Sequence, residues 1–266
     1  MADPALALRD ISKIFPSGRD LVVALDGLTL HVQPREFVSI VGPSGCGKST
    51  LFNLLAGLIR PTAGELWIRG QRAEGQAGLV GYMPQKDLLF PWLTVLDNAA
   101  LGLQLQGTAA GPARDEARAL LPRFGLEGFE RSYPNALSGG MRQRAAFLRT
   151  VLCRRDILLL DEPFGALDAL TRQSMQEWLL SLWDELRPTV LFVTHDIDEA
   201  LFLSDRVYVM TPRPGRVALE VTVPLARPRD YHVLTQPELV RLKAELLDAL
   251  RGPRAADGRP SEGGRQ

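Results

Sequence analysis

The stretch that most limits the fold of this chain is the nonapeptide GPSGCGKST at residues 42–50. It satisfies the pattern G-x-x-x-x-G-K-[ST]. It lies between a short apolar run, EFVSIVG at 36–42, and a segment with helical spacing from Lys48 to Leu58. A strand that leads into a glycine-rich loop and then a helix is the setting in which this pattern binds phosphate. The chain is therefore expected to contain an open α/β sheet with a phosphate-binding loop at the carboxyl end of a buried strand.

Each residue of this loop has an expected part in holding a nucleotide. Gly42, Gly45 and Gly47 allow successive N–H groups to point at phosphate oxygens, because no Cβ atom stands in the way. The helix that follows presents the positive end of its dipole to the same anion. Lys48 is expected to reach the β- and γ-phosphates, and Ser49 to give an oxygen ligand to Mg²⁺. The predicted nucleotide-binding set in the loop is Gly42, Pro43, Ser44, Gly45, Cys46, Gly47, Lys48, Ser49 and Thr50.

Strands and helices alternate along most of the chain. The runs at 6–15 and 21–32 alternate apolar and polar residues and predict strands of an antiparallel flank. Beyond the segment 87–145, which is helical in pattern, the alternation returns. It gives helices at 141–152, 171–186 and 198–204 and strands at 156–163, 189–196 and 206–211. The predicted fold is α/β: a P-loop NTPase core with a mostly parallel sheet, an antiparallel β flank and an inserted α-helical subdomain.

The domain organisation follows from the same alternation. Residues 1–86 and 146–225 are predicted to form the nucleotide-binding core with its flank, and residues 87–145 the inserted helical subdomain. The segment 226–251 contains an amphipathic helix that is expected to cap the core rather than to bind a partner. Residues 252–266 lack apolar periodicity and are expected to be a disordered tail.

The composition excludes several classes of protein. Lys plus Arg and Asp plus Glu both total 31 of 266 residues, so nothing globally basic indicates nucleic acid as a partner. The two cysteines have no metal-ligand spacing and suit a reducing compartment. The N-terminus has no secretion signal, and the longest apolar runs are far shorter than a membrane span. We therefore expect a cytosolic protein, whose partners need not be cytosolic.

Two neighbouring carboxylates follow the apolar strand in ILLLDEP at 157–163. Ligands of open parallel sheets lie beyond the carboxyl ends of the strands, so Asp161 and Glu162 are expected to project toward the phosphates. Because neighbouring residues of a strand point in opposite directions, the two carboxylates cannot do the same work. Asp161 is predicted to hold Mg²⁺, and Glu162 to orient and polarise the attacking water. A cap of a helix or turn is the alternative, which the upstream lysine loop disfavours.

Two further features are predicted to belong to the site. His195 ends another apolar strand and is expected to contact the γ-phosphate or the water, although a structural histidine is the alternative. The helix at 141–152 begins directly after Ser138, Gly139 and Gly140, so LSGG is a second helix start that can bind an anion. One chain is not expected to fold this start onto its own phosphate. Two chains arranged head to tail would each lend it to the γ-phosphate held by the other.

The combination of GPSGCGKST, LSGGMRQR, ILLLDEP and THD resembles the nucleotide-binding subunit of an ABC transporter over about residues 6–220. The resemblance implies an ATPase dimer, with ATP and Mg²⁺ as cofactors, beneath a membrane permease. By matching position, Phe15 resembles the aromatic residue that stacks on adenine, with packing of a strand as the alternative. Gln85 resembles the glutamine that senses Mg²⁺ and the attacking water, and Asp168 the loop that communicates across the dimer. The implied catalytic residues are Glu162, His195 and Gln85, and the implied metal ligands are Ser49, Gln85 and Asp161.

Finer similarities favour an importer. PWLTVLDNAALGL, EPFGALDALTR and MTPRPGRV are similar to the subfamily that serves nitrate, sulfonates, taurine and related small solutes. This implies a peripheral subunit on the cytoplasmic face of the inner membrane, paired with a second copy of itself and served indirectly by a solute-binding protein. Phe90 and Trp92 in LLFPWLTV (88–95) are candidates for the permease contact, with the core of the helical lobe as an equal alternative. A soluble ABC-type ATPase without transport, and a small-molecule P-loop kinase, are the competing hypotheses.

Overall fold

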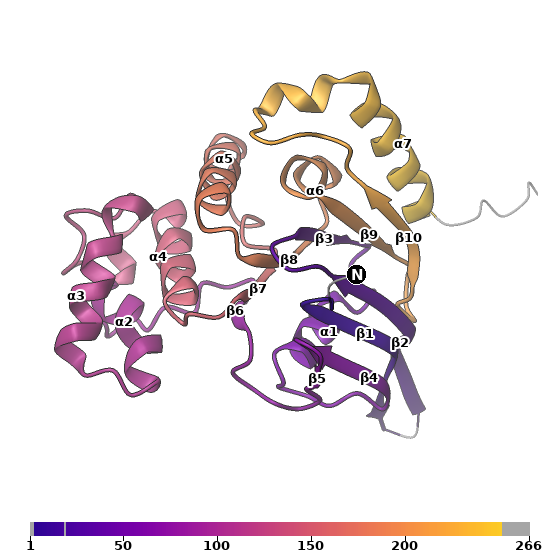
Figure 1. Ribbon diagram of the computed structural model, residues 1–266, viewed down its shortest axis with the longest axis horizontal. Coiled ribbons are helices and arrows are strands. Elements are labelled where there is room, and N and C mark those ends of the chain that lie inside the picture. The colour runs from indigo at the N-terminus through magenta and orange to yellow at the C-terminus, as the bar shows by residue number, and fades with distance from the viewer. Residues whose placement is uncertain (1–2, 19, 252–266) are drawn as a thin grey trace, which may run out of the picture.

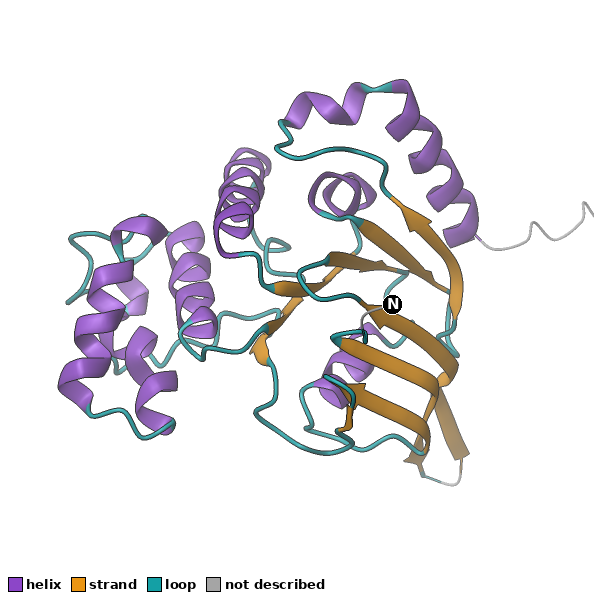
Figure 2. Cartoon of the chain, viewed as in Figure 1, coloured by secondary structure: helices purple, strands orange, loops and turns teal. Residues whose placement is uncertain are grey.

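The computed structural model describes residues 3–18 and 20–251, and a six-stranded sheet forms its centre (Figures 1 and 2). The strand order is β10-β9-β3-β8-β7-β6. The five strands from β9 to β6 run parallel, and β10 pairs with β9 in the antiparallel sense. The strands are β3 (Phe37–Val41), β6 (Gly81–Met83), β7 (Ile157–Asp161), β8 (Thr189–Thr194), β9 (Arg206–Met210) and β10 (Val217–Thr222).

A second, antiparallel sheet has the order β2-β1-β4-β5 and lies beside the first (Figure 1). Its two long strands, β1 (Leu6–Ser17) and β2 (Asp20–Val32), pair along most of their length. The shorter strands are β4 (Ala63–Ile68) and β5 (Gln71–Arg72). This sheet is the flank that the alternating patterns of the N-terminal segment predict.

The helices divide between the sheet and a separate group (Figure 2). In Figure 1, α2 (Val95–Leu105), α3 (Ala110–Leu120) and α4 (Gly139–Val151) lie to one side of the sheets as a helical lobe. The helices that cover the sheets are α1 (Lys48–Leu55), α5 (Ala169–Leu186), α6 (Ile197–Leu203) and α7 (Pro237–Arg251). Short 3₁₀ turns lie at Pro122–Phe124, Pro134–Ala136 and Tyr231–Thr235.

The parallel sheet is buried on both faces, which explains its continuous apolar strands. In β7 the alternate residues Ile157 and Leu159 pack in one cluster with α1 and the antiparallel sheet. Leu158 and Leu160 pack in another cluster with α5 and the helical lobe. Since side chains alternate along a strand, Asp161 continues the row that faces α1. A third cluster joins α6 and α7 to β9 and β10, and Leu239 and Leu246 of α7 are buried in it.

The predicted fold class is confirmed, and the differences from the expected elements are local. The helix after the phosphate loop ends at Leu55 instead of Leu58, because Gly57 follows with a φ of +74° that ends the helix. The strand β10 was not predicted, although its sequence VALEVT is mostly apolar and its residues alternate in exposure. The expected boundary at 145/146 falls inside α4, so the division of the chain there stays a prediction. The expected tail, 252–266, lies outside the described residues.

Among the described residues, none of the helices is both long enough and apolar enough to cross a lipid bilayer.

Candidate functional site

The strand order brings the carboxyl ends of five neighbouring strands to one edge of the parallel sheet. The phosphate loop follows β3, and Asp161 and Glu162 stand at the end of β7. Gln85 follows β6, and His195 follows β8, so both flank the end of β7. Residues that lie far apart in the sequence, from Gly42 to His195, therefore share one edge, as the rule for ligands of open α/β sheets requires.

The glycines at 45 and 47 are required by the backbone of the phosphate loop. Gly45 and Gly47 have φ angles of +77° and +106°, which side chains with a Cβ rarely adopt. A Cβ at Gly47 would also lie 2.7 Å from Leu25 Cδ2 and 2.9 Å from the Ala24 carbonyl oxygen. Gly47 precedes α1 without any side-chain cap, so the first N–H groups of α1 remain open to an anion.

Lys48 is buried and bends back over its own loop. Its Nζ donates hydrogen bonds to the carbonyl oxygens of Gly42 at 2.8 Å and Pro43 at 3.1 Å. These contacts hold the ammonium group beside the space where an anion would sit. Cys46 is 1% exposed, and burial raises the pKa of its thiol, so its side chain is a packing element of the loop.

A cleft of about 420 Å³ opens beside this loop, a size typical of small-molecule sites. The half-buried ring of Phe15 lies at one end, where Lys13 Nζ is 5.0 Å from the ring centroid. The cleft also reaches Gln85 and Glu162. Its other lining residues are Val22, Ala24, Ser44, Gly45, Gly47, Lys48, Ser49, Thr50 and Arg213. Gly42, Pro43 and Cys46 do not line it, because they form the back of the loop.

Glu162 lies at the centre of a polar trio. Its Oε2 accepts a hydrogen bond from Gln85 Nε2 at 3.1 Å and lies 3.4 Å from His195 Nδ1. The backbone of Glu162 has a φ of +45°, a strained conformation that is often found at functional positions. Its N–H still donates a hydrogen bond to the Val193 carbonyl at 2.9 Å, so pairing with β8 keeps the backbone in this conformation. The structure thus brings together the three residues that the sequence predicts to be catalytic.

Asp161 is buried beside Glu162, and the described residues form no salt bridge with it. Burial, and next the negative charge of Glu162, raise the pKa of Asp161 to about 6, against the opposing effects of Lys48 and a hydrogen bond from Tyr82. Burial beside Asp161 also raises the pKa of Tyr82 to about 12. A desolvated carboxylate of this kind is a good ligand for a divalent cation. Ser49 and Gln85 line the cleft, and their hydroxyl and amide oxygens are, like the Asp161 carboxylate, ligands of the type that Mg²⁺ prefers.

The LSGG segment occupies a different surface. Ser138 caps α4, and its hydroxyl accepts a hydrogen bond from Met141 N at 3.3 Å. Cβ atoms added at Gly139 and Gly140 would lie 3.3 Å from Leu167 and 3.1 Å from Thr171, so the glycines also let α4 start close to α5. Among the described residues that line the cleft, none belongs to α4. The two glycine-rich helix starts are therefore separate within one chain.

Asp168 stands at the start of α5, near this second helix start. Its carboxylate accepts a hydrogen bond from Thr171 N at 3.1 Å and caps α5. The hydrogen bonds from Thr171 lower the pKa of Asp168. Asp168 is exposed and does not line the cleft of the same chain.

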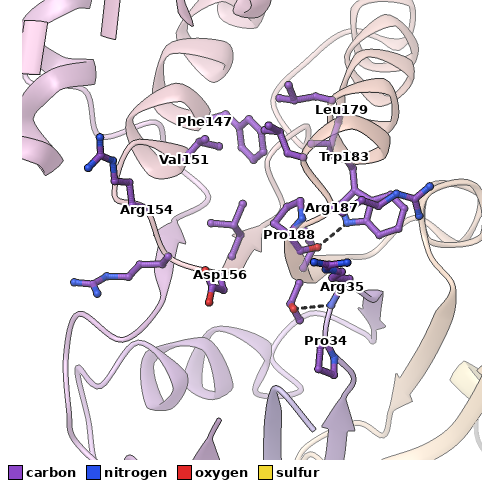
Figure 3. A pocket seen from close by; sticks show the side chains of 16 residues that line it. Pro34, Arg35, Phe147, Val151, Arg154, Asp156, Leu179, Trp183, Arg187 and Pro188 are labelled. Atoms are coloured by element: carbon purple, nitrogen blue, oxygen red, sulfur yellow. Dashed lines mark hydrogen bonds between the residues drawn. The ribbon is translucent and has the colours of Figure 1, made fainter. Parts of the chain in front are cut away.

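A cavity of about 550 Å³ lies at the opposite edge of the sheet (Figure 3). Arginines and apolar side chains line it, but Figure 3 shows that Arg154 and Arg187 point away from its centre. Arg154 pairs with Glu116, and the Arg187 guanidinium lies 4.4 Å from the ring centroid of Trp183. Without converging charges or a glycine-rich loop, this cavity is a poor match for a nucleotide despite its size.

The segment after Gln85 divides between the surface and the core. Leu88, Phe90 and Trp92 are exposed, the last at 69%, whereas Leu89 and Val95 are buried in the helical lobe. The rings of Phe90 and Trp92 are in contact, with centroids 5.2 Å apart and planes tilted by 42°.

Two side chains hold the backbone of this segment. Asn98 bonds the backbone at Phe90, Leu93 and Thr94, at distances from 2.8 to 3.1 Å. Arg149 donates to the carbonyl oxygens of Asp87 and Leu88, both at 2.7 Å. The aromatic pair is therefore presented on a fixed loop.

Sequence reasoning missed Tyr82 and Arg213. Tyr82 is hidden in a short strand, and only the pairing of β6 with β7 places it near Asp161. Arg213 lies in a proline-rich turn whose sequence signals a loop but not its position. The position of Arg213 could have been inferred from the predicted strand at 206–211, because the carboxyl end of a parallel strand lies at the same edge of the sheet as the phosphate loop.

Comparison with known proteins gives a consistent result. The family model described as ABC transporter matches residues 25–165. The nitrate import ATP-binding protein NrtD of a Synechocystis strain is 42% identical and covers 93% of this chain and 95% of its own length. The aliphatic sulfonates import ATP-binding protein SsuB of Bacillus cereus is 42% identical, over 84% of this chain and 88% of that protein. A dimeric post-hydrolysis state of the ATP-binding cassette MJ0796, bound to ADP and Pi, has a TM-score of 0.73 at 32% identity, covering 83% of this chain and 100% of that one.

Proposed function

The chain belongs to the ABC transporter family as an ATP-hydrolysing subunit of the importer type, and we propose that two copies close around ATP to drive uptake of a small solute. The observation that carries this proposal is the position of Glu162. It lies at the edge of the nucleotide cleft, with Gln85 and His195 at its carboxylate. A carboxylate in this position suits the activation of water beside a bound phosphate chain.

Binding of ATP begins with the groups of the cleft. Phe15 offers an aromatic face to adenine, and the open N–H groups of the phosphate loop donate hydrogen bonds to the phosphate oxygens. Lys48 leaves its carbonyl partners in the loop and turns its charge to the β- and γ-phosphates. Ser49, Asp161 and Gln85 would hold Mg²⁺, which neutralises phosphate charge during hydrolysis.

Hydrolysis depends on how the trio orients water. Glu162 accepts a proton from the attacking water, and the Gln85 amide holds the carboxylate in position. His195, at 62% side-chain exposure, follows β8 and lies beside Glu162, and we expect it to contact the γ-phosphate of bound ATP.

The second copy completes each site. Since Ser138–Gly140 lie away from the cleft of their own chain, a partner's helix start can cover the exposed phosphate. Two head-to-tail copies would then bury two nucleotides, and the loss of γ-phosphate would loosen the pair. The related cassette bound to ADP and Pi is dimeric, which supports this arrangement.

The permease contact is proposed for the exposed segment with Phe90 and Trp92. An exposed aromatic pair on a fixed loop, close in sequence to Gln85, suits a partner surface and a route for coupling. This role places the subunit at the cytoplasmic face of the membrane as a peripheral protein. The names of the relatives favour a solute such as nitrate or a sulfonate, delivered by a solute-binding protein.

The variant Glu162→Gln tests the ATPase and the dimer together. Turnover should fall at least 100-fold, which is within the range for loss of a general base, while ATP still binds. Gel filtration with ATP and Mg²⁺ should then show a stable dimer of the variant. Normal hydrolysis by the variant would remove Glu162 from its role. A variant that binds ATP but stays monomeric at high protein concentration would contradict the shared site.

The permease contact has a separate test in the assembled transporter. Replacing Phe90 and Trp92 by serine should abolish solute uptake and leave the ATPase rate of the isolated subunit within about twofold. Leu105→Ser is the matched control, since Leu105 is 81% exposed on α2 of the same lobe. Full uptake by the double variant would place the permease contact elsewhere.

A further inference from the structure

The turn between β9 and β10 reaches the nucleotide cleft from the side opposite to Glu162. In the strand order, β9 is the neighbour of β3, so the turn at 211–216 starts beside the phosphate loop. Arg213 lies in this turn, is exposed and lines the cleft together with Phe15, Ala24 and Lys48. The site described so far assigns no part to it.

Gly215 fixes this turn against the phosphate loop. Its N–H donates to the Ala24 carbonyl at 3.0 Å, and its carbonyl accepts from Asp26 N at 3.1 Å. A Cβ at this position would collide with the Cys46 carbonyl oxygen, so the turn can approach the loop only through glycine. Thr211 closes the turn through hydrogen bonds with Pro214 and Arg216.

Arg213 is presented without a partner. Pro212 and Pro214 flank it, and the fixed φ of proline lowers the entropy cost of holding the arginine in place. Across residues 3–18 and 20–251, no side-chain hydrogen bond or salt bridge involves the Arg213 guanidinium. In the same turn Arg216 differs, because it pairs with Asp26.

The negative charge of a bound nucleotide calls for a second cationic side chain in the cleft. ATP carries about four negative charges at neutral pH, and an arginine recognises phosphate through two parallel N–H donors. Lys48 and Arg213 are the cations among the described lining residues, and Glu162 adds a negative charge. Lys48 is placed for the β- and γ-phosphates, so among the described lining residues Arg213 is the remaining cation for the phosphate nearest the ribose.

We propose that Arg213 binds this α-phosphate of ATP, which deepens the proposed function and rests on it. The turn is anchored at Ala24, and Ala24 lines the cleft with Val22, whose strand partner in the sheet is Phe15. Arg213 therefore extends from a point between the adenine end and the phosphate loop. From this position the arginine can bind the phosphate between the ribose and the β-phosphate. Because the turn joins β9 to β10, binding of the nucleotide also contacts these two strands.

Titration of the purified full chain with ATP, ADP and adenosine tests this assignment. Arg213→Ala should lower the affinity for ATP and for ADP by about tenfold, as expected when a charge-assisted hydrogen-bonded pair is lost. The affinity for adenosine should not change. The dependence of ATP affinity on salt should decrease in this variant. Arg213→Lys, which keeps the charge and loses the fork, should recover part of the affinity.

Arg216→Ala is the matched control, since it removes an arginine from the same turn that already has a partner. It should bind ATP within about twofold of the unaltered chain. Equal affinity of Arg213→Ala and the unaltered chain for ATP would overturn the proposal. An equal loss for adenosine, or an equal loss in Arg216→Ala, would also overturn it. Failure of the unaltered chain to bind ATP would instead refute the proposed function.

Discussion

The two glycine-rich helix starts of this protein solve different problems. At 42–50, Gly45 and Gly47 take positive φ angles, and α1 begins with no side-chain cap. At 138–140, the helix begins with a capping serine, and the glycines serve close packing against α5. The first start leaves its N–H groups for an anion and surrounds them with a cleft. The second is exposed at Ser138 and has no cleft of its own among the described residues.

This difference teaches that a glycine-rich helix start is not one kind of site. A loop with positive φ angles makes a binding cradle by itself, because its N–H groups converge. A capped start of ordinary backbone offers only the end of a helix dipole, which is weak unless another surface completes it. We therefore propose that the second start needs a partner's surface to bind an anion, and substitutions can separate the roles of the two starts.

The largest expected contrast comes from one substitution at each start. Lys48→Ala should lower ATP affinity of the isolated chain by about 10- to 100-fold, because charge-assisted contacts with phosphate are lost. Ser138→Arg should leave that affinity within about twofold and still abolish turnover, since the bulky side chain blocks the partner's phosphate. Calorimetric titration and phosphate release measure the two effects. A large loss of ATP affinity in Ser138→Arg would mean that the second start serves its own chain.

Mixing the two inactive variants sharpens the comparison further. In a dimer of one Lys48→Ala chain and one Ser138→Arg chain, one composite site has both defects and the other has neither. Random pairing should therefore restore about a quarter of the normal turnover. Tagged chains confirm that mixed dimers form. Absence of any recovery in proven mixed dimers would contradict the shared sites.

Replacing glycine by alanine should affect the two starts unequally. Gly47→Ala forces a Cβ into a left-handed backbone against Leu25 and Ala24, and should cost about 2–4 kcal/mol of unfolding free energy. A Cβ at Gly140 meets two flexible side chains, Thr171 Cγ2 at 3.1 Å and Met175 Sδ at 4.0 Å, and alanine favours the helix, so Gly140→Ala should stay within about 1 kcal/mol. Urea unfolding of both variants provides the measurement. Equal losses would show that the second start is also strained.

The smallest effect is expected from the caps. Ser138→Ala removes the cap of α4 and should cost about 1 kcal/mol, as should Thr94→Ala at α2, where Thr94 accepts from Asp97 N at 3.1 Å. Both losses appear in urea unfolding. If Ser138 also contacts a partner's phosphate, only Ser138→Ala lowers turnover. If Thr94→Ala lowered turnover by the same amount, the effect of Ser138→Ala would be explained by the loss of a helix cap alone.

Much of the site was predictable because its chemistry is local. The loop at 42–50 and the carboxylates at 161 and 162 are recognisable from neighbouring residues alone, since a strand end, a glycine φ and a helix dipole are short-range features. Arg213 and Tyr82 were not predictable in this way. Each lies on an element whose sequence is unremarkable, and only the neighbouring strand gives it a place in the site.

The segment 88–95 is a second region whose place in the structure could not be predicted from neighbouring residues alone. Its apolar composition favoured both a partner surface and a core, and periodicity could not separate the two. In the structure, Asn98 fixes the backbone so that Leu89 and Val95 point inward while Phe90 and Trp92 stay exposed.

The sequence by itself determined that this protein has a phosphate loop on an α/β sheet, because spacing and residue type along a few positions specify that loop. Only the tertiary structure decided the distances at which Gln85 and His195 approach Glu162, 3.1 and 3.4 Å, and the positions of Tyr82 beside Asp161 and of Arg213 at the cleft. The reason is strand order. The pairing of β6, β7 and β8 depends on the burial of both faces of the sheet. That burial involves contacts between segments far apart in the sequence, so no short stretch of sequence specifies it.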